Sequence, residues 1–189
     1  MLLGSCHAPG TLKEVFVTAP QVLRHAAIVG LVAIGLTGCA ARSTAVVTQP
    51  VPVDALRSYK VVAVSVESGV TEDVAGEVAG LAAGVVSRLG KTGKFTQVRV
   101  AGATESAPGT LILKVTIVKV KKISSTARFL AGAFAGRANV TVDVKMIDAA
   151  SGKTVGAQSV VGESGGSGLA GGTGDAVDKA CEGIAKLFM

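Results

Sequence analysis

The chain has 189 residues, of which 49% are hydrophobic, 17% are charged and 25 are glycine, with a formal net charge of +6. This composition is too apolar for a disordered chain, and its glycines follow no collagen-like period, so we expect one folded domain. Aromatic residues make up only 3%, and Trp is absent, which argues against the stacked-ring platforms of sugar sites and single-stranded nucleic-acid sites.

Residues 1–38 are typical of a secretory signal peptide. Ala26–Leu36 is an uncharged apolar run of 11 residues that follows Arg24 and His25. The run is shorter than the roughly 20 residues that cross a bilayer, so a signal peptide is favoured over a permanent transmembrane helix. The segment before it is longer than an ordinary n-region, which leaves open a misassigned start of translation, with Val22 as one alternative.

The leader ends in Leu36-Thr37-Gly38-Cys39, which resembles the lipobox of bacterial lipoproteins. The resemblance implies lipidation of Cys39 by diacylglyceryl and acyl groups such as palmitate, after cleavage before that residue. An ordinary signal peptide with an incidental cysteine is the alternative. Two or more acyl chains hold a protein stably at a membrane. Because Ala40 rather than an aspartate follows the cysteine, the resemblance implies the periplasmic side of the outer membrane.

Removal of the leader takes away both histidines, His7 and His25, and leaves Cys39 and Cys181 as the cysteines. Without His there is no Ser-His-Asp or Cys-His relay and no imidazole ligand for a metal. We therefore expect a protein that is not an enzyme and has no metal site and no cofactor. With Cys39 lipidated, Cys181 has no disulfide partner, and its place on an apolar helix face predicts inert packing in the core.

Residues 39–58 predict a lipid anchor and a flexible tether, because they are small, polar and marked by Pro50 and Pro52. We expect a single α+β domain over residues 59–189. Lys60–Val66 predicts a buried strand, and Thr71 precedes a helix that ends at Gly90 or Gly93. The apolar stripe of this helix is Val74, Val78, Leu81, Val85 and Leu89.

Four further strands are predicted before a second helix over Asp175–Phe188, and their ranges are Phe95–Val100, Leu111–Lys122, Asn139–Ile147 and Lys153–Glu163. The alternation of the long strand slips near Ile117, which indicates a bulge. The order β-α-β-β-β-β-α predicts a largely antiparallel sheet of about five strands with both helices packed on one face.

Gly76, Gly80 and Gly84 recur every four residues in the first helix, and each costs about 1 kcal/mol relative to alanine in a helix interior. Close packing of the helix within its own fold and a helix–helix contact between subunits are both open explanations. A second possible interface is the apolar connection between Arg128 and Arg137, which contains Phe129 and Phe134. A tucked-in crossover, a subunit contact and a wedge into the membrane interface remain open for it.

Four lysines, Lys114, Lys119, Lys121 and Lys122, cluster on the long strand. They indicate a solvated face or a protected sheet edge, with an anion-binding surface as the alternative. No nucleic-acid motif accompanies them, so we expect no nucleic-acid partner. Gly166–Gly171 fits the pattern G-x-G-x-x-G, but no second strand follows it, so a flexible loop is favoured over a dinucleotide site.

Together, the lipobox, the stretch from Ala127 to Asp148, the Ser151-Gly152-Lys153 turn, the glycine-rich loop and the final helix resemble the bacterial lipoproteins grouped as domain of unknown function 4410. The likeness covers most of residues 60–188 and brings no active site. The order of elements is also similar to periplasmic domains of envelope assembly proteins such as the curli secretion channel.

We expect a non-enzymatic lipoprotein, anchored to the membrane through Cys39, that acts as a binding or envelope-assembly component, as a homo-oligomer or with an envelope protein partner. The alternative is a carrier or sensor for a small anionic or lipidic ligand. An open apolar cavity lined by Lys114 or Lys122 favours the carrier, whereas a filled core with an apolar outer patch favours assembly.

Overall fold

The computed structural model describes residues 41–51, 53–103, 105–124, 136–165 and 172–189, together with Thr126 and Leu130. The chain divides into the units Met1–Gly38 and Cys39–Met189, and the described residues belong to the second. Their elements are β1 (Arg42–Gln49), α2 (Val53–Leu56), β2 (Val61–Ser68), α3 (Ala75–Lys91), β3 (Gln97–Val100), β4 (Thr110–Lys121), β5 (Asn139–Asp148), β6 (Thr154–Glu163) and α5 (Thr173–Lys186).

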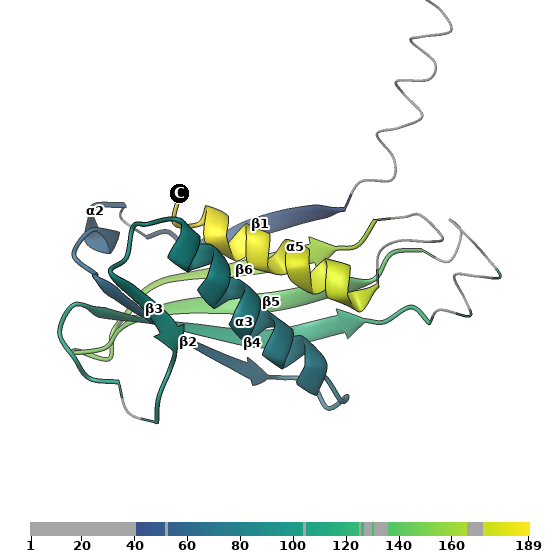
Figure 1. Ribbon diagram of the computed structural model, residues 1–189, viewed down its shortest axis with the longest axis horizontal. Coiled ribbons are helices and arrows are strands. Elements are labelled where there is room, and N and C mark those ends of the chain that lie inside the picture. Colours follow the sequence, from purple (N-terminus) through teal and green to yellow (C-terminus); the bar gives the residue numbers. More distant parts are fainter. Residues whose placement is uncertain are drawn as a thin grey trace, which may run out of the picture. The chain divides into compact units, whose positions relative to one another are not determined.

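The fold is α+β, with one mixed six-stranded sheet in the order β1-β6-β5-β4-β2-β3. The helices α3 and α5 lie side by side on one face of this sheet (Figure 1). The predicted α+β class is confirmed, and the predicted order β-α-β-β-β-β-α recurs from β2 to α5. The sheet has one strand more than expected, and α2 is a third helix in the described part of the chain.

The predicted antiparallel character holds for three of the five strand pairs, and the sheet is mixed. The β4–β5, β5–β6 and β6–β1 pairs are antiparallel, whereas β2 is parallel to both β3 and β4. The reason is the crossover through α3, which returns the chain to the end where β2 began, so that β3 must run in the same direction. β4 is parallel to β2 as well, so the chain returns once more between Val100 and Thr110.

Residues 42–49 are a strand rather than part of a flexible tether. β1 pairs with β6 from Arg42 opposite Glu163 to Gln49 opposite Ala157. Its sequence, RSTAVVTQ, is rich in β-branched residues that suit a strand. Pro50 follows the last residue of β1, where a missing N–H removes no bond from the sheet. The domain therefore begins nearer to Cys39 than the sequence suggested.

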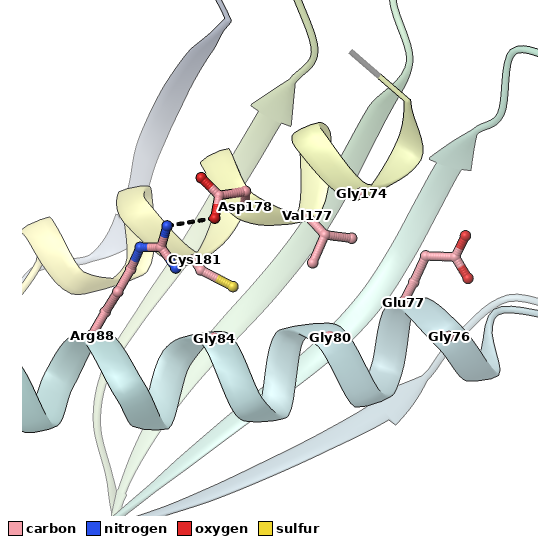
Figure 2. A pocket seen from close by; sticks show the side chains of 9 residues that line it. All are labelled: Gly76, Glu77, Gly80, Gly84, Arg88, Gly174, Val177, Asp178 and Cys181. Carbon is pink, nitrogen blue, oxygen red and sulfur yellow. Dashed lines mark hydrogen bonds and ion pairs between the residues drawn. The ribbon is translucent and has the colours of Figure 1, made fainter. Parts of the chain in front are cut away.

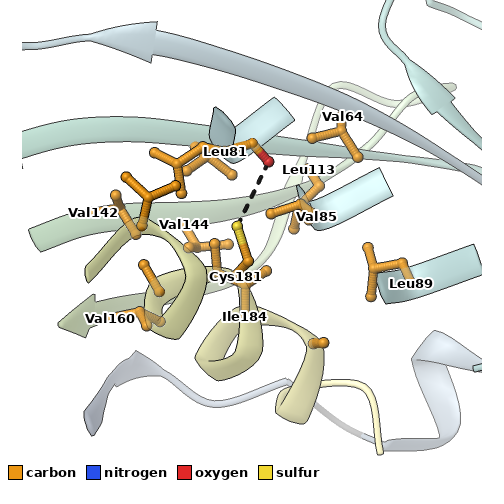
Figure 3. Close-up of a cluster of buried hydrophobic side chains, with 14 of the residues drawn as sticks. Val64, Leu81, Val85, Leu89, Leu113, Val142, Val144, Val160, Cys181 and Ile184 are labelled. Carbon is orange, nitrogen blue, oxygen red and sulfur yellow. Dashed lines mark hydrogen bonds between the residues drawn. The ribbon is translucent and has the colours of Figure 1, made fainter. Parts of the chain in front are cut away.

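The core lies between the sheet and the two helices (Figure 3). The predicted stripe of α3 is buried there, with Leu81, Val85 and Leu89 fully covered. α3 begins at Ala75, four residues later than its predicted cap at Thr71, and the Asp73 carboxylate accepts the Ala75 N–H at 3.2 Å. The expected bulge in β4 is present, because the register shifts between Ile117 and Lys119.

The register aligns side chains in rows across the strands, and it gives the sheet one covered face and one open face. Val115, Val144 and Val160 are fully buried beneath the helices. Lys114, Lys145 and Asp143 occupy the alternate positions, on the face that no described helix covers. This alternation confirms the prediction of one buried face and one solvated face for β5.

Candidate functional site

The four lysines predicted as an anion-binding surface do not converge on one point. Lys114, Lys119 and Lys121 lie on the open face of the sheet. The Lys114 ammonium lies 3.0 Å from a carboxylate oxygen of Glu67, and this pair, with a hydrogen bond from Thr116, lowers the pKa of Glu67. Lys122 instead reaches α3, 3.0 Å from a carboxylate oxygen of Glu77. Two of the four lysines are therefore already paired with acids.

The glycine stripe of α3 faces α5 of the same chain (Figure 2). A Cβ placed on Gly84 would lie 2.6 Å from the sulfur of Cys181, and one on Gly80 would lie 3.3 Å from a methyl group of Val177. The glycines thus permit close approach of two helices within one subunit, and Gly80 and Gly84 need no second subunit to explain them. A Cβ on Gly76 would meet nothing within 4 Å.

Cys181 is buried between these helices, as predicted, with 1% of its surface exposed. Burial raises the pKa of its thiol to about 11. Its sulfur lies 3.9 Å from the Leu81 carbonyl oxygen, to which the thiol is a weak donor. A protonated thiol in an apolar setting is a packing group and not a nucleophile.

An apolar groove runs along the edge of the sheet beside α3, with a volume of about 530 Å³. This edge groove is lined by Val66, Ser68, Glu72, Asp73, Val74, Ala75, Val78, Ala79, Ala82 and Val100. The groove exists because β3 is short: it pairs with Val61–Val64 only, so residues 65–68 of β2 have an outer edge without a partner strand in the described part of the chain. Val100 in the groove is 58% exposed.

The opposite edge of the sheet is β1, and it is apolar at its centre. Val46 and Val47 are 58% and 54% exposed. One row joins Val47 through Gln158, Val144 and Val115 to Val66 on the far edge. Because partners in such a row point to the same side, Val47 and Val66 lie on the face that bears the helices. Val47, which is exposed at one edge, therefore lies in the same row as Val66 in the edge groove at the other edge.

A third surface was missed by sequence reasoning because three distant segments form it. This surface is a cavity of about 670 Å³, the basic cavity. It is lined by Leu56, Arg57, Lys60, Lys94, Phe95, Leu187, Phe188 and Met189. Neither Lys114 nor Lys122 lines this cavity, the edge groove or the cavity of about 320 Å³ between α3 and α5.

Several predicted site residues lie outside the described residues, namely Cys39, Phe129, Phe134 and the glycine-rich loop 166–171. Among the residues that are described, no three His, Cys, Asp or Glu side chains gather closely enough to hold a metal ion. In the same part of the chain, no helix combines the length and the apolar character needed to cross a membrane.

The described residues form a small two-layer α+β domain, in which one layer is the sheet with its two open edges and the other is the helices α3 and α5. More particularly, the family model described as "Domain of unknown function (DUF4410)" matches residues 57–171, and the chain belongs to this family. No curated protein matches the sequence.

Two solved structures share the fold, both of PelC dodecamers from Paraburkholderia phytofirmans. One, a single-substitution variant, has a TM-score of 0.51, and the other has a TM-score of 0.50. Each is 19% identical to this chain, covers 77% of it and is itself covered over 96% of its length. At this identity the likeness shows the fold.

Proposed function

We propose that this protein is a lipid-anchored lipoprotein of the periplasmic side of the outer membrane that acts, without catalysis, as a self-assembling envelope component. The signal peptide and lipobox support the anchor. The observation on which the assembly part rests is the pair of complementary sheet edges, with exposed Val47 at one and the edge groove at the other.

The short distance between the anchor and the sheet supports a role at the membrane surface. β1 begins at Arg42, three residues after Cys39, and three extended residues span at most about 11 Å. A lipidated Cys39 would therefore hold the domain close to the bilayer. A protein that must reach far into the periplasm would need a longer tether than this one.

The strand directions allow one copy to continue the sheet of the next. β1 is antiparallel to β6, and alternation through β5 and β4 makes β1 antiparallel to β2 as well. A second copy in the same orientation could place its β1 antiparallel beside the unpaired residues 65–68 of β2, with Val47 next to Val66. Unpaired backbone N–H and C=O groups at such edges favour addition of a strand.

The charges at the two edges are opposite in sign, which favours this arrangement. Arg42 is the only charged residue of β1, and 65% of its side chain is exposed even though it pairs with Glu163. The edge groove has Glu72 and Asp73 at its rim. A contact between two different edges is heterologous, so it repeats until a ring closes or a filament forms. The dodecamers with the same fold support a closed ring.

The anchor is tested by Cys39→Ser, expressed in a diderm bacterium. We expect the unmodified protein to fractionate with the outer membrane and the variant to be released or to accumulate as an uncleaved precursor, because the thiol is the attachment point. Membrane fractionation with mass spectrometry of the N-terminal peptide measures both outcomes. A variant that still matures and stays with the outer membrane would contradict the lipoprotein part of the proposal.

The assembly is tested by Val47→Asp in a chain that begins at residue 39 and has Cys39→Ser. We expect the unmodified chain to form oligomers and Val47→Asp to dissociate them, because a buried, unpaired carboxylate opposes the contact. Light scattering after size-exclusion chromatography gives the masses, and circular dichroism checks the fold. The control is Val118→Asp, at a 42% exposed bulge position of the inner strand β4, which should leave the oligomer intact.

If the unmodified chain is a monomer at high concentration, the assembly proposal fails. The same holds if Val118→Asp dissociates the oligomer as completely as Val47→Asp, because the contact would then not be at the sheet edge.

A further inference from the structure

The basic cavity lies where the C-terminal ends of α3 and α5 meet the start of β2. Lys94 and Phe95 follow α3, Leu187–Met189 follows α5, and Arg57 and Lys60 lie between α2 and β2. This end of the sheet is opposite to the end where β1 begins at Arg42, because Arg42 pairs with the last residue of β6. The cavity is therefore remote from the point where the lipid anchor joins the domain.

The floor of the cavity is apolar and aromatic. Phe95 and Phe188 meet edge to face, with ring centroids 5.7 Å apart and planes at 77°. Phe188 is 4% exposed and belongs to the core, so the floor is held firmly in place. The partly buried side chains of Leu56 and Leu187 extend this floor. A flexible hydrocarbon chain could lie on such a surface and remove apolar area from water.

The rim of the cavity is cationic. Arg57, Lys60 and Lys94 line it, and no Asp or Glu side chain is among its described walls. Lys94 donates a hydrogen bond at 2.7 Å to the main-chain oxygen of Met189, the last residue of the given sequence. Among the described residues, Arg57 pairs with Asp54 at 3.6 Å, and both side chains are mostly exposed, so this pair contributes little to stability.

Helix polarity does not explain Lys60. Basic residues at the end of a helix are stabilised by its dipole, and Lys91 and Lys186 occupy those positions in α3 and α5. Arg57 and Lys60, in contrast, lie outside both helices, and Lys60 has no ion pair in the described part of the chain. Three cations above an apolar floor are suited to a ligand that is anionic at one end and apolar at the other.

We infer that the basic cavity binds a single-chain amphipathic anion, with its carboxylate or phosphate between Lys60 and Lys94 and its hydrocarbon chain on Phe95 and Phe188. The volume of about 670 Å³ lies within the range of roughly 300–1,000 Å³ that is usual for small-molecule sites. This site is separate from the proposed edge contact and from the lipid anchor, and it uses none of the four lysines predicted from the sequence.

The test uses the chain that begins at residue 39 with Cys39→Ser, because the buried core lies entirely within this unit. Calorimetric titration with laurate, below its critical micelle concentration, measures binding. Acetate supplies the same charge without the chain, and dodecyltrimethylammonium supplies the same chain with the opposite charge. We expect laurate to bind and both comparison ligands to bind at least about tenfold more weakly, because head and chain must both be recognised.

The variant Lys60→Glu/Lys94→Glu should weaken laurate binding by roughly tenfold or more, because two attractive charges become repulsive. The control Lys119→Glu/Lys121→Glu makes the same charge change on the open face of the sheet and should leave the affinity unchanged. All four lysines are exposed, so both variants should fold, which circular dichroism checks.

Equal affinity for laurate in the two double variants would overturn the inference, as would equal binding of dodecyltrimethylammonium. Binding is also measured for dodecyl phosphate and for vesicles that contain phosphatidylglycerol. Dodecyl phosphate reports on a free amphiphile, and the vesicles report on a lipid within a bilayer. A third outcome would also overturn it: the unmodified chain binds the vesicles but not laurate, and Lys60→Glu/Lys94→Glu loses the vesicle binding. The lysines would then bind a membrane surface and not a single-chain ligand. None of these outcomes depends on lipidation or on the oligomeric state, so the proposed function is tested independently.

Discussion

Among the described residues, Glu105 and Glu182 are the acids whose pKa is lowered to about 2, and Glu105 is the one bound by an arginine. Its carboxylate forms a two-point contact with the Arg99 guanidinium and accepts the Gly102 N–H at 2.9 Å. Only 6% of its side chain is exposed. The hydrogen bonds from Arg99, and then that from Gly102, lower the pKa of Glu105 from 4.5 to about 2. This contact fastens the connection after β3 to the open face of the sheet.

The lowered pKa of Glu105 sets the direction of a pH effect. The contribution of the ion pair to stability is complete above about pH 4.5 and is lost as the pH falls toward about 2, because the folded state resists protonation of this carboxylate. Glu105→Gln should therefore lower the thermal unfolding midpoint at neutral pH, and the gap from the unmodified chain should close on acidification. Differential scanning calorimetry across this range measures the gap. A gap that does not change with pH would contradict this role.

At the scale of elements, the contact between α3 and α5 depends on glycine at one position and not at another. Gly84→Ala would bring a methyl group to 2.6 Å from the Cys181 sulfur, and we expect a loss of about 1–3 kcal/mol in the free energy of unfolding. Gly76→Ala meets nothing within 4 Å and should be neutral or stabilising by up to about 1 kcal/mol. Denaturant unfolding compares the two. Equal effects would show that the helices do not approach as closely as described.

The elements that could be predicted from sequence have a strong internal period. The α3 stripe through Leu81, Val85 and Leu89 and the alternation of β5 around Val142 both follow from the sequence alone. β1 could not be predicted in this way, because its valines are exposed and its strand state depends on pairing with β6. Parallel pairing of β2 with β4 likewise depends on the crossover and not on any local pattern.

Prediction of the site had a similar limit. Strict period-two alternation puts Lys114 and Lys119 on opposite faces, and the bulge between Ile117 and Lys119 brings them to the same face. The acids that pair with Lys114 and Lys122 come from β2 and α3, which the sequence separates from β4. The basic cavity combines three segments around residues 57, 94 and 188, and none of them contains a motif.

At the scale of the whole molecule, the sheet is unclosed, and its two edges differ in a complementary way. β1 exposes valines, whereas the short β3 leaves an apolar groove beside an unpaired segment of β2. Natural proteins usually protect such edges with charge, bulges or a covering element. β1 has one charged residue, at its first position. β1 also has a register shift between Val47 and Gln49. The proposed repetition of this chain in one orientation would cover both edges at once.

Disulfide trapping tests this central claim most directly. In the chain with Cys39→Ser, the variant Val47→Cys/Val66→Cys should form a ladder of covalent oligomers on mild oxidation, because each chain offers one thiol to each neighbour at a separation suited to a disulfide. Val47→Cys alone should form no covalent dimer, and buried Cys181 should not interfere. Absence of cross-links in the double variant, or a dimer from Val47→Cys alone, would contradict the joining of unlike edges.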